Sequence, residues 1–215
     1  MIDLHTHTIL SDGDLLASEL ARRAEVAGCN AIAITDHVDH SNIDMILPGI
    51  VRVSEALNKF WDIFVIPGVE ITHVPLELFS ELTSYAREKG AKIVVGHGES
   101  SVEPVIPGTN EAAINAGVDI LAHPGFISEK DASLAKEKGV YLEISARNGH
   151  SRTNRHVFNT ASKAGAKLVV NTDAHSPEDI LTPEKRDEIL SFLTDSEEVK
   201  TGIFKNSEEI VNRLK

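Results

Sequence analysis

Short apolar runs alternate with longer amphipathic stretches along this 215-residue chain. The runs with the length and aliphatic content of buried strands are 2–5, 31–35, 63–67, 92–95, 118–122, 140–144 and 168–171. Helix-like stretches stand between and after them, at roughly 14–28, 50–60, 76–89, 109–116, 129–138, 153–164 and 184–193. Regular alternation of strand and helix predicts right-handed βαβ units and a parallel sheet.

Side chains that bind metals stand just past most of these runs. They occupy positions 5, 37, 70, 97, 123 and 173, with Arg147 between the last two, and successive gaps run from 24 to 33 residues. Such gaps are close to the ~31-residue βα unit of a (β/α)₈ barrel. An open doubly wound sheet would gather ligands from only two or three strands, at its switch point. We therefore expect an α/β fold, a distorted (β/α)₇ TIM-like barrel, with residues 1–215 in one domain.

Nine residues form the candidate metal-ligand set: His5, His7, Asp12, His37, Glu70, His97, His123, Asp173 and His175. Imidazole and carboxylate are ligands that divalent transition metals select, and both need partners at the ends of buried strands. The two-residue spacing of His5 with His7, and of Asp173 with His175, projects each pair to one side of its strand. In a barrel, the carboxyl ends of the strands carry the active site.

Nine ligands exceed what one tetrahedral zinc requires and suit two or three ions with open positions. Clustered ions serve phosphoryl hydrolysis, because one acidifies a bound water to hydroxide and the others neutralise the phosphate and the leaving oxygen. Glu70 can bridge two ions through its separate oxygens. Mixed nitrogen and oxygen ligands suit zinc, manganese or iron.

Charge and composition narrow the range of partners. The formal net charge of −12 opposes binding to nucleic acid through a basic surface, so we expect a nucleotide only as a small substrate. No apolar run approaches the ~18 residues of a membrane span. The first residues lack the features of a signal peptide, and a single cysteine suits a reducing compartment, so we expect a cytoplasmic location.

The candidate ligands stand in motifs that resemble those of a known family. The motifs are His5-Thr6-His7 with Ser11-Asp12-Gly13, Thr35-Asp36-His37, Gly68-Val69-Glu70, Val95-Gly96-His97, Leu121-Ala122-His123-Pro124 and Thr172-Asp173-Ala174-His175. Through them the chain resembles the PHP family, the polymerase and histidinol phosphatase domain, from its first residues to Pro177. We expect the long substrate-binding insertions of true histidinol phosphatases, and a polymerase domain, to be missing.

This resemblance implies a distorted (β/α)₇ barrel with a trinuclear metal site and metal-dependent phosphoesterase activity. It also implies how the ligands are shared: the first ion by His5, His7, Glu70 and Asp173; the second by Glu70, His97 and His123; the third by Asp12, His37 and His175. Family members place either His or Asp at the position of Asp12, so the residue there bears on the third ion's affinity or identity.

Two further residues join Glu70 and Asp173 as candidate catalytic groups. Arg147 follows the strand 140–144, where a guanidinium can bind a phosphate bidentately. His150, three residues on, can protonate the leaving oxygen. A surface arginine and an ordinary loop histidine are the alternative interpretations. The segment after His97 is longer than an ordinary βα loop of ~2–6 residues and is typical of a lid or substrate wall.

The leading hypothesis is therefore a phosphoesterase that acts on a small phosphorylated metabolite or nucleotide. A metal-dependent amidohydrolase-like hydrolase is an alternative, because barrels with H-x-H on the first strand also host that chemistry. A catalytic lysine would favour it, yet Lys92 and Lys167 begin strands rather than end them. A non-catalytic barrel module, for example one associated with RNA, needs a basic surface and should have lost ligands. A purely structural metal site rarely exceeds four ligands per ion.

Overall fold

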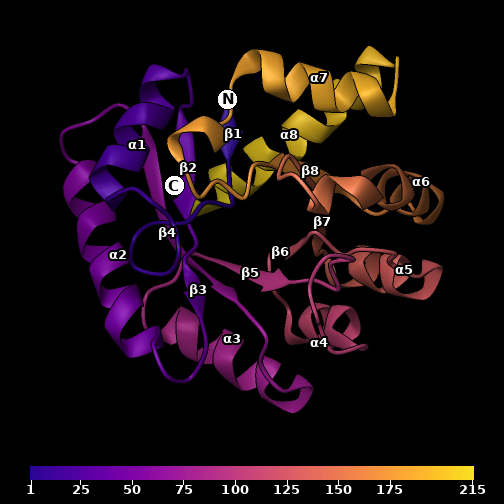
Figure 1. Ribbon diagram of the computed structural model, residues 1–215, viewed down its shortest axis with the longest axis horizontal. Helices are drawn as coiled ribbons and strands as arrows, with labels where there is room; N and C mark the ends of the chain where they lie inside the picture. Colours follow the sequence, from indigo (N-terminus) through magenta and orange to yellow (C-terminus); the bar gives the residue numbers. More distant parts are fainter.

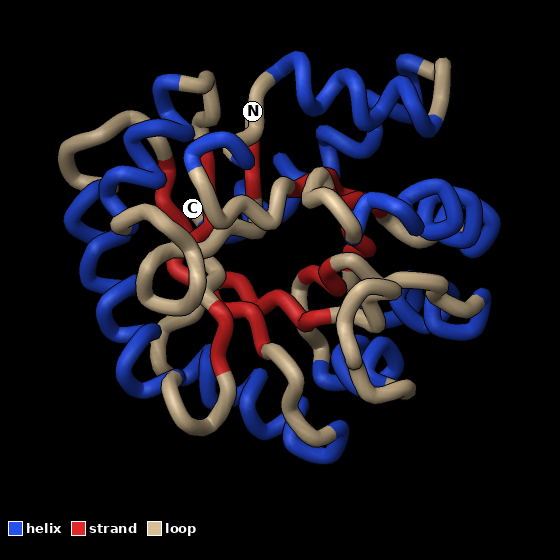
Figure 2. The backbone as a smooth tube through the Cα atoms, in the orientation of Figure 1, coloured by secondary structure: helices blue, strands red, loops and turns tan.

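A parallel sheet curls around the centre of the computed structural model, which describes residues 1–215, and helices pack outside it (Figures 1 and 2). The strands are β1 (Ile2–Asp3), β2 (Ala31–Ile34), β3 (His37–Val38), β4 (Phe64–Ile71), β5 (Ile93–His97), β6 (Ile120–Ala122), β7 (Tyr141–Ser145) and β8 (Leu168–Asn171). The helices are α1 (Ala17–Val26), α2 (Ile43–Leu57), α3 (Phe79–Glu88), α4 (Thr109–Ala116), α5 (Glu129–Lys138), α6 (Asn154–Ala164), α7 (Pro183–Leu193) and α8 (Glu197–Leu214). Single 3₁₀ turns form at Leu76–Leu78, His150–Thr153 and Pro177–Asp179. The predicted α/β barrel is confirmed.

Strand order follows the chain: β1-β2-β4-β5-β6-β7-β8, with β3 paired to β4 beyond β2. Ile34 pairs with Pro67 and His37 with Glu70, so β2 and β3 keep one register along β4 and form a single interrupted strand. Seven strand positions result, as the spacing predicted. One parallel bridge, between Thr6 and Ala174, brings the first and last strands together and closes the ring at its carboxyl end.

Alternate side chains of the strands enter two different cores. Val95 and Tyr141 point into the barrel and belong to an inner cluster of 13 buried residues. Their neighbours Val94 and Leu142 point outward and belong to a cluster of 41 residues between the sheet and the helices. Because side chains alternate along a strand, the inward set continues at the strand ends into the polar residues of the site.

Two helices differ from the sequence-based expectation. The α2 helix begins at Ile43 rather than near residue 50, and it continues through Pro48. Its buried residues Ile43, Ile46, Leu47 and Ile50 follow helical spacing, so their packing outweighs the ~3 kcal/mol penalty of an internal proline. The α8 helix was not expected at all. Its Ile210 and Val211 join the inner cluster, and it contacts β1 and β8. No helix is long and apolar enough to cross a bilayer.

Gly68 offers a test of how tightly the barrel is packed beside the site. A Cβ atom there would lie 2.5 Å from Ile93 Cγ2 and 2.8 Å from the Ile93 carbonyl oxygen. Overpacking of a core costs about 1–3 kcal/mol, so Gly68→Ala should lower the free energy of unfolding by that amount. Urea denaturation measures it. Gly202→Ala is the matched control, because a Cβ there meets nothing within 4 Å and should stabilise α8 by about 0.5–1 kcal/mol. Equal effects of the two substitutions would contradict this packing.

Candidate metal centre

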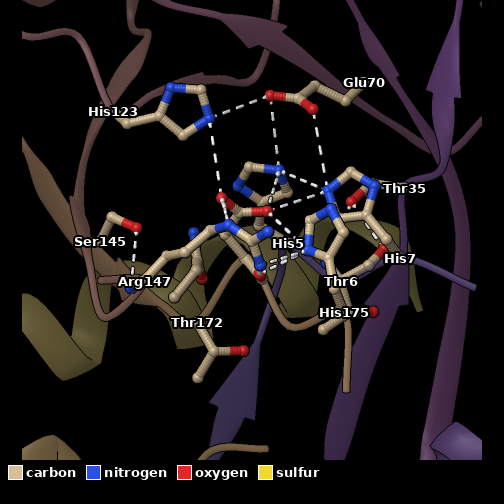
Figure 3. Close-up of polar contacts among 12 residues, drawn as sticks. His5, Thr6, His7, Thr35, Glu70, His123, Ser145, Arg147, Thr172 and His175 are labelled. Carbon is tan, nitrogen blue, oxygen red and sulfur yellow. Dashed lines mark hydrogen bonds and ion pairs between the residues drawn. The ribbon is translucent and has the colours of Figure 1, made fainter. Parts of the chain in front are cut away.

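All nine candidate ligands lie at the carboxyl end of the barrel. His5 and His7 follow β1, His37 begins β3, Glu70 lies in β4, His97 ends β5, His123 follows β6, and Asp173 and His175 follow β8. Asp12 comes from the turn after β1. Figure 3 shows Glu70 and His123 facing His5, His7 and His175 across the site. The chain thus gathers side chains separated by about 170 positions of sequence into one cluster, as a closed barrel requires.

Glu70 occupies the centre of the cluster. Its Oε1 lies 3.4 Å from His5 Nε2 and 3.3 Å from His123 Nε2, and its Oε2 lies 2.7 Å from His37 Nδ1. The carboxylate is completely buried. Each of its oxygens therefore faces a different part of the cluster, which is the geometry that a bridging carboxylate needs.

His5 and His7, which follow β1, lie close to each other and to Asp173, which follows β8. His5 Nε2 and His7 Nε2 lie 3.0 Å apart, and His7 Nε2 lies 3.1 Å from Asp173 Oδ1. On the outer side, Asp12 Oδ1 lies 3.2 Å from His175 Nε2. Nitrogen and oxygen lone pairs converge at both places.

Several buried polar atoms of the cluster have no hydrogen-bond partner: His7 Nδ1, Glu70 Oε1, His123 Nδ1 and Asp173 Oδ1. A buried polar group without a partner costs about 1–3 kcal/mol. A cation among these atoms would satisfy the carboxylate oxygens, so the residues fit divalent metal ions.

The ligand atoms fall into groups whose members lie within 4.8 Å of one another. These groups are His5-His7-Asp173, Glu70-His97-His123 and His7-Asp12-His37-His175. The second and third groups contain the sets that the motif resemblance implies, the first contains its set apart from Glu70, and metal ligation itself stays a prediction.

Glu143 orients the cluster from inside the barrel, and the sequence analysis missed it. Its Oε1 accepts hydrogen bonds from His5 Nδ1 and Asn171 Nδ2, both at 2.9 Å, and its Oε2 accepts one from the His123 backbone N–H at 3.0 Å. Because Nδ1 of His5 donates to Glu143, Nε2 is left free to face the centre. The available signal was a carboxylate inside the otherwise apolar run 140–144, where alternation places it on the inward side with Tyr141.

Asp36 holds the turn that carries Asp12. Its carboxylate accepts hydrogen bonds from the backbone N–H and hydroxyl of Thr8, at 2.8 and 2.9 Å. It also accepts from the backbone N–H and hydroxyl of Ser11, at 3.2 and 2.7 Å. The turn is thereby fixed next to β3, which explains how the partly exposed Asp12 side chain reaches His37 and His175.

Two residues of the cluster have left-handed backbone conformations. His123 has φ +28° and Asp173 has φ +53°, both unusual for residues other than glycine. Such conformations cost of order 1–3 kcal/mol and concentrate at functional sites, where surrounding contacts maintain them. In this chain they direct an imidazole and a carboxylate into the cluster directly after β6 and β8.

Mutual contacts keep the acids ionised despite burial. Burial raises the pKa of Glu70, but the charges of His5 and His37 outweigh it and hold that pKa well below its usual range. Burial also opposes ionisation of Asp173, yet His5 and His7 lower its pKa. Burial lowers the pKa of His7 to about 4. The carboxylates in turn raise the pKa of His5 and bring that of His37 to about 9, although burial opposes both shifts, so cations that bind these imidazoles must displace their protons.

Arg147 and His150 stand at the edge of the cluster. Arg147 Nη1 lies 2.7 Å from His175 Nδ1 and donates to the Asp173 carbonyl oxygen at 3.2 Å. The ring of His150 stacks on His123 at 4.2 Å, and its Nε2 lies 3.7 Å from Asp173 Oδ2. Both residues thus reach the site, while the roles expected of them stay predictions.

A further residue that the sequence analysis missed is Glu103, in the long segment after β5. Its Oε2 lies 2.6 Å from His97 Nε2. The unusual length of that segment was the only signal in the sequence.

Comparisons with known proteins identify the family of the chain. The model of the PHP domain family matches residues 3–123. An uncharacterized protein of Methanocaldococcus jannaschii is 44% identical, over 99% of each chain. A probable phosphatase of Thermoanaerobacter sp. strain X514 is 29% identical, over 84% of this chain and 81% of that protein.

Two solved structures share the fold at low sequence identity. A chain of an archaeal ribonuclease P with mature tRNA superposes with a TM-score of 0.75 at 18% identity, covering 100% of this chain and 91% of that chain. A histidinol phosphate phosphatase from Lactococcus lactis, in complex with zinc, L-histidinol and phosphate, gives 0.61 at 15% identity, covering 89% and 93%. These likenesses show the fold alone.

Metal removal tests the centre without reference to activity. Treatment with EDTA followed by dialysis should lower the melting temperature, and added Zn²⁺ or Mn²⁺ should restore it, because an ion that binds only the folded state stabilises it. At 100 times the Kd the gain is about 2.7 kcal/mol, or roughly 5–10 °C for a chain of this size. Differential scanning calorimetry measures the shift.

His123→Ala should lose most of the metal-dependent shift. His40→Ala should keep it, since His40 is an exposed histidine whose nearest acid is Glu81 at 3.9 Å. A melting temperature that does not respond to metal would contradict the proposed centre.

Proposed function

Because the chain belongs to the PHP domain family, we propose that it is a metal-dependent phosphoesterase acting on a small phosphorylated metabolite or nucleotide. The observation that carries the proposal is the convergence of nine ligand-type side chains on one end of the barrel. Relatives named probable phosphatases are consistent with it. A single ion with a structural role would not need so many ligands.

The residues of the cluster form separate groups that could hold two or three ions. Glu70 lies between the groups and can bridge them. Asp173 forms one group with His5 and His7, and Asp12 belongs to another with His37 and His175. When bound, divalent ions supply an acidified water as nucleophile and neutralise charge on the phosphate. Glu143 keeps His5 in the tautomer that ligation requires, through its 2.9 Å hydrogen bond with Nδ1.

Arg147 is the proposed phosphate-binding residue. Its side chain is 32% exposed, so the guanidinium lies between the cluster and solvent. The Asp173 carboxylate, 3.6 Å from Arg147 Nε, and the Asp173 carbonyl hold it at the edge of the site. A guanidinium placed there can donate two hydrogen bonds to a phosphate whose other oxygens face the ions.

His150 is the proposed donor to the leaving oxygen. Ser100 Oγ lies 2.6 Å from its Nδ1 and can accept a hydrogen bond from it, so a protonated ring keeps its second proton on Nε2. Burial lowers the pKa of His150 to about 4, so the ring has to take up this proton together with the negatively charged phosphate. Nε2 faces Asp173 and the interior of the site.

The alternatives are supported less well. Lysines that an amidohydrolase-like site would use are missing from the strand ends, since Lys92 precedes β5 and Lys167 precedes β8. A non-catalytic module would not need all nine ligands. The net charge of −12 also opposes a role as an RNA-binding barrel.

Loss of a central ligand should abolish hydrolysis. Asp173→Ala and His97→Ala should each lower kcat/KM for 4-nitrophenyl phosphate by at least about 10²-fold, because the ion-dependent nucleophile is lost. His40→Ala serves as the control and should retain activity. Circular dichroism checks that each variant folds, and unchanged turnover in both ligand variants would remove the proposal.

Arg147→Ala should act mainly on substrate binding. Loss of charge-assisted hydrogen bonds costs about 1.5–3 kcal/mol, so KM should rise roughly 10- to 100-fold with a smaller change in kcat. Steady-state kinetics with inorganic phosphate as a competing product would show the same weakening. Arg152, an exposed arginine of the same loop, is the matched control. Equal effects of Arg147→Ala and Arg152→Ala would show that Arg147 has no special part in phosphate binding.

A further inference from the structure

The segment 98–108, between β5 and α4, is built against the barrel. Glu99 Oε1 accepts hydrogen bonds from the backbone N–H groups of Gly108 and Asn110, at 2.9 and 3.0 Å. In return, Asn110 Oδ1 accepts one from the Glu99 N–H at 2.9 Å. These bonds tie the two ends of the segment together, so its middle residues are held over the site.

Two side chains from the middle of this segment enter the cluster. Ser100 is buried and contacts His150, as described above. Glu103 is more exposed than Ser100 but also reaches the cluster: its Oε2 is 2.6 Å from His97 Nε2, and its Oε1 is 3.8 Å from His150 Nε2. Although its side chain as a whole is 35% exposed, Glu103 Oε2 is buried and has no well-formed hydrogen bond.

His97 has one nitrogen free to bind an ion. Its Nδ1 lies 3.0 Å from the Gly98 carbonyl oxygen and donates to it, which leaves Nε2 unprotonated in the neutral ring. His97 is nevertheless shared by two groups with metal-binding spacing, Glu70-His97-His123 and His73-His97-Glu103. In both groups the ligand atoms lie within 4.8 Å of one another, so Glu103 lies within reach of an ion held at His97.

We propose that Glu103 is an additional carboxylate ligand of the ion at His97, supplied by the 98–108 segment. The inference rests on the metal centre of the proposed function and extends it. Glu103 Oε2 approaches the same nitrogen that the ion would use, without forming a well-aligned hydrogen bond to it, as expected of two ligands directed at a common point. Its negative charge adds to that of Glu70, and both favour a divalent cation.

Binding of an ion by Glu103 would also fix the position of the segment. When Glu103 binds the ion, the middle of the segment is anchored at the site as well as at its two ends. Metal binding and the ordering of residues 98–108 are then coupled, because each stabilises the other.

Competition with a chelator tests the proposal directly. Metal-stripped protein is titrated with Zn²⁺ in the presence of a chromogenic chelator, for wild type, Glu103→Gln, His97→Ala and Ser101→Ala. In Glu103→Gln, one ion should bind roughly 10- to 100-fold more weakly and the others as in wild type. His97→Ala should weaken the same ion, and adding Glu103→Gln to it should cause no further loss, since coupled residues are not additive. Ser101→Ala, an exposed position of the same segment, should match wild type.

The outcomes separate the two claims. Unchanged or tighter Zn²⁺ binding in Glu103→Gln would overturn the assignment, since Glu103 would then be an ion-pair partner that competes for His97. Failure of the wild type to bind any ion would overturn the proposed function together with it.

Hydrogen exchange supplies an independent readout. Addition of Zn²⁺ should slow amide exchange over residues 98–108 several-fold in wild type and leave it unchanged in Glu103→Gln. Equal protection in both proteins would show that the segment does not use Glu103 to sense the ion.

Discussion

Glu70 is a fully buried carboxylate whose neighbours are imidazoles rather than the usual backbone N–H groups or a guanidinium. Burying this negative charge costs free energy unless it is paired. The surrounding histidines offset only part of that cost, because Glu70 Oε1 has no hydrogen-bond partner. The arrangement of the site follows from that constraint. Strands β3 and β5, the turns after β6 and β8, and the carboxylate of Glu143 all place donors or ligand atoms around it.

The barrel and its ligand cluster depend on each other. The backbone bridge between Thr6 and Ala174 joins β1 to β8 at the site, since Thr6 lies between His5 and His7 and Ala174 lies between Asp173 and His175. Ligands from the first and last strands are therefore adjacent only because the ring closes there. Cations shared by the two pairs would in turn hold that closure, and their binding energy would then add to the stability of the fold.

Most of the architecture follows from sequence periodicity because each buried strand is a short apolar run with a helix-length interval after it. The same reasoning failed at α2, which was expected only from about residue 50, whereas a well-spaced apolar face carries the helix from Ile43 through Pro48. It also failed at α8. The apolar residues Ile210 and Val211 have the spacing of an ordinary amphipathic helix, and only the closed barrel shows that they belong to its inner cluster. Local pattern specifies elements, and tertiary packing decides where they begin and what they cover.

The candidate ligands were identifiable because polar residues directly after buried strands are rare and repeated here at a regular interval. Glu143 and Glu103 could not be identified in the same way: one lies inside a strand, and the other lies in an irregular segment whose path no pattern specifies.

The central claim is that the candidate ligands enclose divalent ions. Anomalous diffraction at a metal absorption edge, from crystals of protein purified without chelators, tests it most directly. The account predicts two or three peaks among Glu70, Asp173 and the surrounding imidazoles; a cluster filled only by water, even after soaking in Zn²⁺ or Mn²⁺, would contradict it.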